Sequence, residues 1–500
     1  MRTKSIFRAT AILSSSSIIS IFLSLIVAKI LALYLQPEGF GFYGLLQSFV
    51  SVASLVAGMG VATGIVRMGA ASAAREDFSA MAVLTKGCWI LFVILGGLST
   101  CLIAICRKQL SIIVLGDSGH GPTMLLMSVA LLFTVASNIQ VGTLNAHHRV
   151  AALAKYGIVN TVLSSSMSIA SVLLWRRHGI VPAVIASSVG GWIASRYFLS
   201  REVGPQAVVK PQWRDAFASA RELLRFGAPF TGSMFVGTGV QLLLPIIVLH
   251  LLNPQSVGYY RAAAGISVGY LGFLITAMGQ DYYPRVSAAA DNPTELVRLI
   301  NAQHRLVMLV AVPVILFTLA VVPYAVPLVY SAQFKPTVAI LEWQLMGDIF
   351  KFASWTMSFA ILARCTSSVY FVVELLGGFV TLLTTWFGVK WFGLSGLGTS
   401  FLCTYVIYYV MVWIVIRREV PLVWSGANKK MLIAAVIAAS IVRVLPYTSL
   451  APYRTYIAIG LTLFAAVPSL WIVRREFKAS PTHFGEVSPT PVETEQIASA

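Results

Sequence analysis

The segment LQPEGFGFY spans residues 35–43, and the segment LNPQSVGYY spans residues 252–260. Pro37, Gly41 and Tyr43 of the first segment each recur 217 residues later in the second. Further landmarks follow in the same order at similar offsets, including Arg67 and Arg285. Pro-x-x-x-Gly turns are common by chance, but several landmarks in one order favour an internal repeat.

The composition around these segments is that of a membrane protein. Of the 500 residues, 57% are hydrophobic and only 11% are charged, and the mean hydropathy is +0.82. A soluble domain carries about 25% charged residues, so an ordinary soluble enzyme and a disordered protein are both excluded. Runs long enough to cross a bilayer core of about 30 Å number about fourteen. They cover residues 11–35, 42–66, 83–105, 122–144, 151–174, 179–199, 227–251, 257–283, 306–330, 336–363, 368–389, 393–416, 431–446 and 455–473.

The repeat offset spans six of these runs and therefore indicates a parallel repeat, with its pseudo-twofold axis along the membrane normal. The expected fold is an all-α polytopic membrane protein with two parallel six-helix lobes around a central cavity and two peripheral helices. The expected divisions are an N-terminal lobe (1–200), a cytoplasmic linker (201–226), a C-terminal lobe (227–420), two extra spans (421–475) and a disordered cytoplasmic tail (476–500). The thirteenth run is the weakest, because Arg443 and Pro446 interrupt it.

The distribution of Lys and Arg predicts the orientation. With the N-terminus in the cytoplasm, the cytoplasmic segments carry about three times as many basic residues as the opposite side. Cytoplasmic loops favour Lys and Arg, so both termini are expected in the cytoplasm and the number of spans is expected to be even. Because the surplus of +18 lies mostly between apolar runs, it suits a bilayer rather than a nucleic acid.

The sequence lacks the motifs of several kinds of functional site. The five Cys residues show neither a CxxC motif nor metal-ligand spacing, so no disulfide framework and no metal site is expected. The sequence also shows no nucleophile–base constellation and no glycine-rich phosphate loop. We therefore expect a transporter without a cofactor, rather than an enzyme, and one that does not use ATP within this chain.

Ionisable residues inside the spans are the candidate functional groups, because charge at depth is costly and usually faces protein or water. Asp348 and Lys351 lie three residues apart near the expected mid-membrane level. They form either a closed ion pair that orients two helices or part of a water-lined site for an anion, an ion or a proton. Glu374 lies nearer the cytoplasmic interface and is a second candidate for ion coupling.

Four further basic residues are candidates for an electropositive cavity. Lys29 and Arg261 lie near the outer ends of their spans, where snorkelling to the interface also explains them. Arg67 and Arg285 mark the cytoplasmic ends of repeat-related spans, where the excess of basic residues on that side also explains them. Together with Lys351, these residues suit a phosphate or diphosphate, for which Arg supplies forked donors.

The two repeat segments, together with Gly60-x-x-x-Gly64-x-x-Arg67, resemble the Wzx-type polysaccharide flippases of the MOP exporter superfamily over about residues 1–420. The resemblance implies translocation of an undecaprenyl-diphosphate-linked oligosaccharide across the bacterial inner membrane. It also implies a role in assembly of lipopolysaccharide O-antigen, common antigen or exopolysaccharide. The implied partners are this lipid-linked oligosaccharide, membrane lipids, and the polymerase and chain-length regulator of the same pathway, with no nucleic acid.

The resemblance implies a basic central cavity, which Lys29, Arg67, Arg261, Arg285 and Lys351 would line, with Asp348 and Glu374 as coupling candidates. Transport would follow alternating access, in which the two lobes rock about a fixed site. The nearest rival is a multidrug or cation antiporter of the same superfamily, which predicts an acidic cavity. A membrane polymerase or ligase would need a large outer loop, and a scaffold protein would move no substrate.

Overall fold

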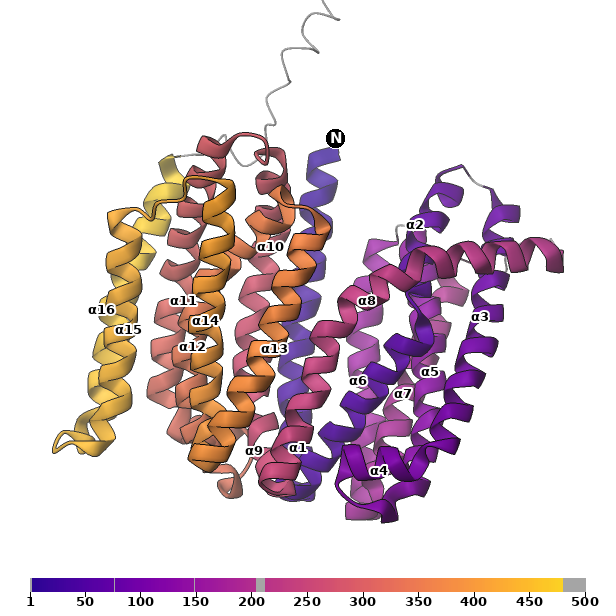
Figure 1. The fold of residues 1–500 in the computed structure, drawn as a ribbon, viewed down its shortest axis with the longest axis horizontal. Helices are drawn as coiled ribbons and strands as arrows, with labels where there is room; N and C mark the ends of the chain where they lie inside the picture. The colour runs from indigo at the N-terminus through magenta and orange to yellow at the C-terminus, as the bar shows by residue number, and fades with distance from the viewer. Residues whose placement is uncertain (1, 76, 148, 204–211, 480–500) are drawn as a thin grey trace, which may run out of the picture.

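The computed structural model describes residues 2–75, 77–147, 149–203 and 212–479, and every regular element within them is a helix (Figure 1). Most of the expected tail and residues 204–211 of the expected linker lie outside the described residues. The helices up to residue 203 are α1 (Arg2–Gly58), α2 (Val61–Ala74), α3 (Phe78–Ile105), α4 (Arg107–Leu115), α5 (Gly121–Ala146), α6 (Val150–Trp175) and α7 (Ile180–Glu202).

The second part of the chain is also helical. Its helices are α8 (Trp213–Leu251), α9 (Pro254–Ala264), α10 (Leu271–Ala288), α11 (Pro293–Val329), α12 (Thr337–Arg364), α13 (Ser367–Phe392), α14 (Gly396–Glu419), α15 (Gly426–Val444) and α16 (Arg454–Ala479). A π-helical turn, η3 (Gly265–Tyr270), connects α9 to α10. The short helix α4 and the extension of α8 over residues 213–226 are elements that the hydropathy pattern did not predict.

The first repeat segment lies at a sharp bend inside α1. Gln36 has φ 59° and ψ 177°, which breaks the helix between its two halves. Pro37 then starts the second half, where its missing N–H costs no helical hydrogen bond. In the second segment Asn253 caps α9, with its side-chain oxygen accepting from the Ser256 N–H at 2.8 Å.

The two repeat segments pack directly against each other. A Cβ atom built at Gly258 would lie 1.9 Å from the Pro37 carbonyl oxygen, and one at Gly41 would lie 2.8 Å from the Pro254 carbonyl oxygen. The contact is reciprocal, since each segment presents its proline to the glycine of the other. In a membrane, helices associate through close packing of small residues, because lipid supplies no hydrophobic drive between them. This reciprocal contact, which we call the repeat contact, joins the two parts of the chain.

Nine helical stretches among the described residues are long and apolar enough to cross a membrane, or ten when Pro254–Thr276 and Met278–Ala288, bent by 47°, count as one span. This is fewer than the fourteen expected. Several stretches are composite, because α6 runs into α7 and α13 into α14 across short turns, and α1 bends at Gln36. The stretch α12 is not among the nine and carries four charged residues: Glu342, Asp348, Lys351 and Arg364. The chain is an all-helical, multi-span membrane protein.

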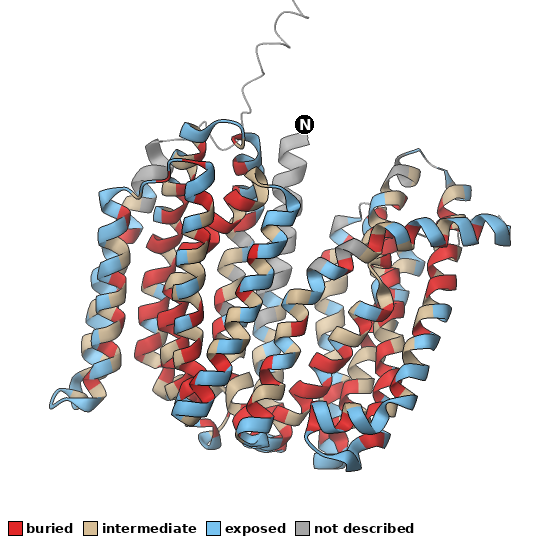
Figure 2. Ribbon diagram, viewed as in Figure 1, coloured by how far each residue is buried: buried red, intermediate tan, exposed pale blue. Residues whose placement is uncertain are grey.

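The helices form two groups that meet near the bend of α1 and diverge toward the end carrying the N-terminus (Figure 1). Helices α5, α6 and α7 pack with the second half of α1, while α11, α12, α13 and α14 pack with one another. The long helix α8 connects the groups, since it contacts α2 and α3 as well as α9 and α13. Buried residues concentrate inside each group, and exposed residues cover the outward faces (Figure 2).

The two C-terminal helices are fixed to α12 by a buried carboxylate. Glu342 pairs with Arg443 at 3.3 Å and also with Arg454, which the sequence places at the two ends of the connection between α15 and α16. Arg443 additionally lies over the Trp343 ring at 5.0 Å. The sequence placed Arg443 inside the thirteenth run, and the role of both arginines as anchors of a peripheral helix pair was missed.

We expect Gly258→Ala to destabilise the protein by about 1–3 kcal/mol or more, because the new methyl group collides with main chain that cannot rotate away. Thermal unfolding of the purified protein in detergent measures this effect. Gly97→Ala is the matched control, since a Cβ atom at Gly97 meets nothing within 4 Å. Its stability should stay the same or rise by up to about 1 kcal/mol. Equal effects of the two substitutions would contradict the repeat contact.

Candidate functional site

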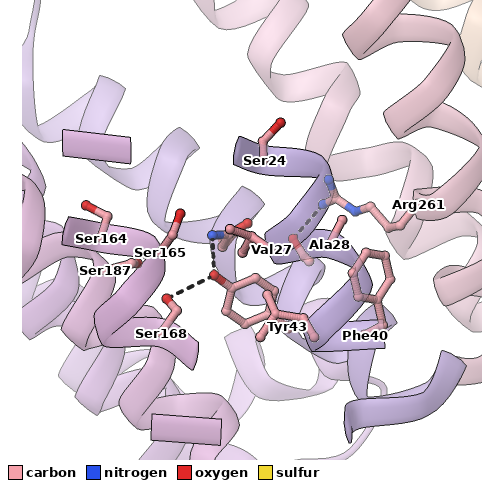
Figure 3. A pocket seen from close by; sticks show the side chains of 13 residues that line it. Ser24, Val27, Ala28, Phe40, Tyr43, Ser164, Ser165, Ser168, Ser187 and Arg261 are labelled. Atoms are coloured by element: carbon pink, nitrogen blue, oxygen red, sulfur yellow. Dashed lines mark hydrogen bonds between the residues drawn. The ribbon is translucent and has the colours of Figure 1, made fainter. Parts of the chain in front are cut away.

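A cavity of about 310 Å³ lies beside the repeat contact and is lined by α1, α6, α7 and α9 (Figure 3). Arg261 lies seven residues into α9 and Tyr43 six residues beyond Pro37, so both are roughly 10 Å from the segment starts. The polar lining residues are Ser24, Tyr43, Gln47, Ser164, Ser165, Ser168, Ser187 and Arg261. Arg261 is the one charged residue among the thirteen lining residues.

Arg261 reaches from α9 across to α1. Its Nη2 donates to the Gly44 carbonyl oxygen at 2.6 Å and to the Ser48 hydroxyl. Its Nε is buried without a hydrogen-bond partner among the described residues. A Cβ atom at Gly44 would lie 2.8 Å from this Nε, so a glycine is required there for the guanidinium to fit. The group therefore has donor capacity left for an anion, because a guanidinium carries five N–H groups.

The wall opposite Arg261 is neutral and rich in hydroxyl groups (Figure 3). Ser168 donates its single proton to the Ala183 carbonyl at 2.9 Å, so the Tyr43 hydroxyl is the donor in the 3.4 Å contact between these two side chains. Tyr43 in turn accepts from the Gln47 amide at 2.8 Å. Ser187 donates to the Val184 carbonyl at 2.8 Å. With their protons used internally, these serines offer mainly acceptor oxygens to the cavity.

An aromatic cluster lies beside the cavity and the repeat contact. Phe40, which lines the cavity from α1, packs edge-on against Tyr330 at 5.8 Å and Phe334 at 5.7 Å between ring centroids. Tyr330 donates from its hydroxyl to the Ala262 carbonyl at 3.0 Å, which fixes the cluster to α9. Phe40 therefore joins the cavity wall to a ring cluster next to the repeat contact.

Three of the predicted basic residues do not line this cavity. Lys29 donates from Nζ to the Leu328 carbonyl at 2.7 Å, at the end of α11. Arg67 is exposed, with its guanidinium 4.4 Å from the Phe226 ring centroid. Arg285 is exposed and pairs with Asp281 at 2.6 Å. Each therefore has its own local partner, and the structure brings none of the three to Arg261.

Lys351 and Asp348 form a separate buried pair in α12, with Nζ and Oδ1 3.5 Å apart. Ser267, in the π-helical turn η3, donates to Asp348 Oδ2 at 2.7 Å. The Lys351 ammonium also lies 5.7 Å from the Tyr405 ring centroid. π-Helical turns often occur at functional sites, and this one aims a hydroxyl at a fully buried carboxylate. The sequence located the pair but gave no signal for Ser267.

Glu374 lies in α13 and accepts a hydrogen bond from the Tyr408 hydroxyl at 2.7 Å. Tyr408 is also 3.2 Å from the Ser358 hydroxyl. The carboxylate is therefore held by a neutral donor, and no ion pair to it is found among the described residues. The structure keeps Glu374 apart from the residues that line the cavity around Arg261.

A second, smaller cavity of about 210 Å³ lies where α1 and α2 meet α5 and α8. Its polar lining consists of Ser54, Thr63, Asn138 and Thr231. None of the residues that line it is charged, so it adds no electrostatic attraction for an ion.

Known proteins share both the sequence pattern and the fold. A family model described as polysaccharide biosynthesis protein matches residues 30–339. The lipid III flippase of Escherichia coli strain K12 is 21% identical over 420 residues, which covers 81% of this chain and 96% of the flippase. The relatives are flippases and transporters, which confirms that this chain is a transporter rather than an enzyme.

Two solved structures have the same fold. The lipid II flippase MurJ in an inward closed conformation aligns with a TM-score of 0.71 at 14% identity, covering 93% of this chain and 99% of MurJ. An inward-facing multidrug resistance MATE family transporter of the MOP superfamily aligns with a TM-score of 0.65 at 15% identity, covering 84% and 99%. The chain thus shares the fold of these two structures and is distantly similar in sequence to the lipid III flippase, and on its match over residues 30–339 it belongs to the polysaccharide biosynthesis protein family.

Proposed function

We propose that the protein translocates an undecaprenyl-diphosphate-linked oligosaccharide across the bacterial inner membrane. The observation that carries the proposal is the cavity in which Arg261 is the single charged lining residue and faces a wall of serines. The guanidinium suits the diphosphate, because Arg donates forked, charge-assisted hydrogen bonds to phosphate oxygens. The serine oxygens suit sugar hydroxyls, which are hydrogen-bond donors. The family and the E. coli relative support the same substrate class.

The transported glycan would serve O-antigen, common antigen or exopolysaccharide assembly, together with a polymerase and chain-length regulator. We propose that the helices make fourteen crossings, counting each half of α1, the bent unit from α9 to α10, and α12 separately. Six crossings then form each of two parallel lobes, at 1–200 and 227–420, and both termini lie in the cytoplasm. The excess of basic residues on that side of the spans supports this orientation.

The mechanism is alternating access around the Arg261 cavity. The repeat contact and the Phe40 cluster lie at one end, and the helix groups diverge toward the other (Figure 1). With the N-terminus in the cytoplasm, as proposed, this arrangement is an inward-facing state. The diphosphate binds Arg261 while the polyprenyl chain stays in the lipid. The lobes then separate at the repeat contact and close at the opposite end. A fixed cation lowers the cost of holding an anion at depth, because charge in a membrane requires a paired or wet site.

The alternative function is a multidrug or cation antiporter of the same superfamily, whose fold the MATE transporter shares. Such a protein needs an acidic cavity to attract its cations. The lining of the large cavity contains Arg261 and no Asp or Glu, which favours the flippase. Asp348 is a buried acidic residue of the type that an antiporter site would need, but it is already paired with Lys351.

We expect Arg261→Ala to slow translocation roughly 10- to 100-fold, because a charge-assisted hydrogen bond contributes about 1.5–3 kcal/mol. Arg261→Lys should retain intermediate activity, since it keeps the charge but loses the fork. The assay measures movement of a fluorescent oligosaccharide on polyprenyl diphosphate in proteoliposomes, read by protection from an external quencher.

Arg298→Ala is the matched control, because Arg298 is an exposed arginine that pairs locally with Glu295 at 2.7 Å. It should translocate at the wild-type rate. Unchanged translocation by Arg261→Ala would exclude the diphosphate role. Export of a cationic dye that persists in Arg261→Ala, with no lipid-linked sugar moved by the wild type, would identify the antiporter instead.

We further propose that ion coupling acts through Asp348, the carboxylate held by Lys351 and Ser267. Asp348→Asn leaves the Lys351 charge buried and unpaired, which should cost about 3–5 kcal/mol of stability. The double variant Asp348→Asn with Lys351→Met removes both charges and should return the unfolding midpoint close to the wild-type value.

The double variant separates a structural pair from a coupling pair. We expect it to fold normally and to translocate at a rate that no longer responds to an imposed proton or sodium gradient. A double variant that keeps the wild-type response would show that the pair only orients α12 against the π-helical turn.

A further inference from the structure

The first part of α8 lies across the ends of neighbouring helices, whereas the rest of α8 slopes along the two groups (Figure 1). The helix is continuous from Trp213 to Leu251. Residues 213–226, which we call the α8 arm, cross near the membrane end that carries the N-terminus. Helices that lie in the plane of a membrane surface present apolar, aromatic and basic residues in separate sectors.

One face of the α8 arm is seated on the N-terminal helices by small residues. A Cβ atom at Gly87 would lie 3.0 Å from the Ala216 carbonyl oxygen, and one at Gly64 would lie 2.8 Å from the Leu223 side chain. Ala216, Ala220 and Leu223, at helical spacing, are buried by these contacts. The arm is therefore a packed part of the fold.

The adjacent face of the α8 arm carries exposed aromatic side chains. Trp213 is 64% exposed and Phe217 is 52% exposed, one helical turn apart. The Lys86 ammonium lies 3.9 Å from the Trp213 ring centroid, which orients the ring from the neighbouring helix α3. Trp is enriched at the level of lipid headgroups, because its indole has a polar N–H and an apolar ring, and the Phe217 ring beside it adds apolar area.

The next face of the arm carries the charge. Arg214, Arg221 and Arg225 are all exposed, and at 100° per residue they fall within one sector of about 40°. None of the three forms an ion pair with a described residue, although Asp215 and Glu222 lie on the same arm. Juxtamembrane arginines without local partners are attracted to anionic lipid headgroups.

We propose that the α8 arm is a docking surface for anionic phospholipid headgroups, with Trp213 and Phe217 inserted at the interface and the three arginines on the phosphates. Helix α8 continues without a break from the arm to the segment where Val236 and Val240 pack on Gly378 of α13. The lipid surface therefore holds one end of the helix that links the two groups. The bound lipid therefore fixes the helix that must move when the lobes rock.

The test compares phosphatidylglycerol with phosphatidylcholine, counted on the detergent-purified full chain by native mass spectrometry. The wild type should retain phosphatidylglycerol selectively. In the triple variant Arg214→Gln, Arg221→Gln, Arg225→Gln, the affinity should fall about fivefold for each charge removed. The variant with Lys at all three positions should keep most of the affinity for phosphatidylglycerol. That result would show that the loss of affinity in the Gln variant follows from the loss of charge.

The matched control removes three arginines that each pair with an acidic residue, as Arg285→Gln, Arg298→Gln, Arg364→Gln, and should retain phosphatidylglycerol like the wild type. Equal losses in both triple variants would overturn the proposal, as would a wild type without lipid selectivity. A wild-type arm that captures a protein from the membrane fraction but no phosphatidylglycerol would also overturn it. Because binding is measured without transport, the result stands apart from the proposed flippase function.

Discussion

The repeat contact is the constraint on which the rest of the structure depends. Pro37 faces Gly258 while Pro254 faces Gly41, so the two repeats touch through the same motif in both directions. Any side chain at either glycine would place a carbon closer to a main-chain oxygen than van der Waals contact allows. The approach of the two backbones therefore positions α1 against α9, and these helices in turn provide two walls of the Arg261 cavity.

The two repeat segments share the Pro-x-x-x-Gly motif but differ in the chemistry that follows it. Arg261 occupies the position that corresponds, 217 residues earlier, to Gly44, and the two residues contact each other. One repeat thus supplies the guanidinium and the other supplies the space and the carbonyl oxygen that receive it. A second arginine at residue 44 would put two like charges in the same volume, so the contact itself requires that the pair be unequal.

The sequence predicted the features that depend on composition and spacing. Hydropathy located nearly every helix, and the recurrence of Pro37 and Gly41 identified the two segments that meet in space. The sequence also identified Arg261 as a candidate, because the position of a charged residue within an apolar run follows directly from the sequence. Sequence spacing does not determine which way a side chain points. Arg67 and Arg285 were candidates for the same cavity as Arg261, yet the structure places them on Phe226 and Asp281.

The sequence pattern did not predict features that depend on contacts between residues distant in the chain. The hydroxyl of Ser267 reaches Asp348 only because α9 continues through a π-helical turn, which no motif announces. The seating of the α8 arm likewise depends on Gly64 and Gly87, which lie far from it in the sequence. Hydropathy reads the arm as a polar linker, because its buried face consists of only a few small residues.

The bonds made by Arg261 connect substrate binding to the movement of the lobes in the proposed flippase. The guanidinium that would hold the diphosphate also ties α9 to α1 through Gly44 and Ser48, beside the repeat contact. Phosphate oxygens and the Gly44 carbonyl compete for the same N–H groups, so each phosphate contact that replaces a helix contact weakens the closed end of the cavity. By linkage, opening of that end must alter the affinity for the anion by the same factor. An unloaded carrier would keep its seal, and a loaded one would loosen it, which is the order of events that alternating access requires.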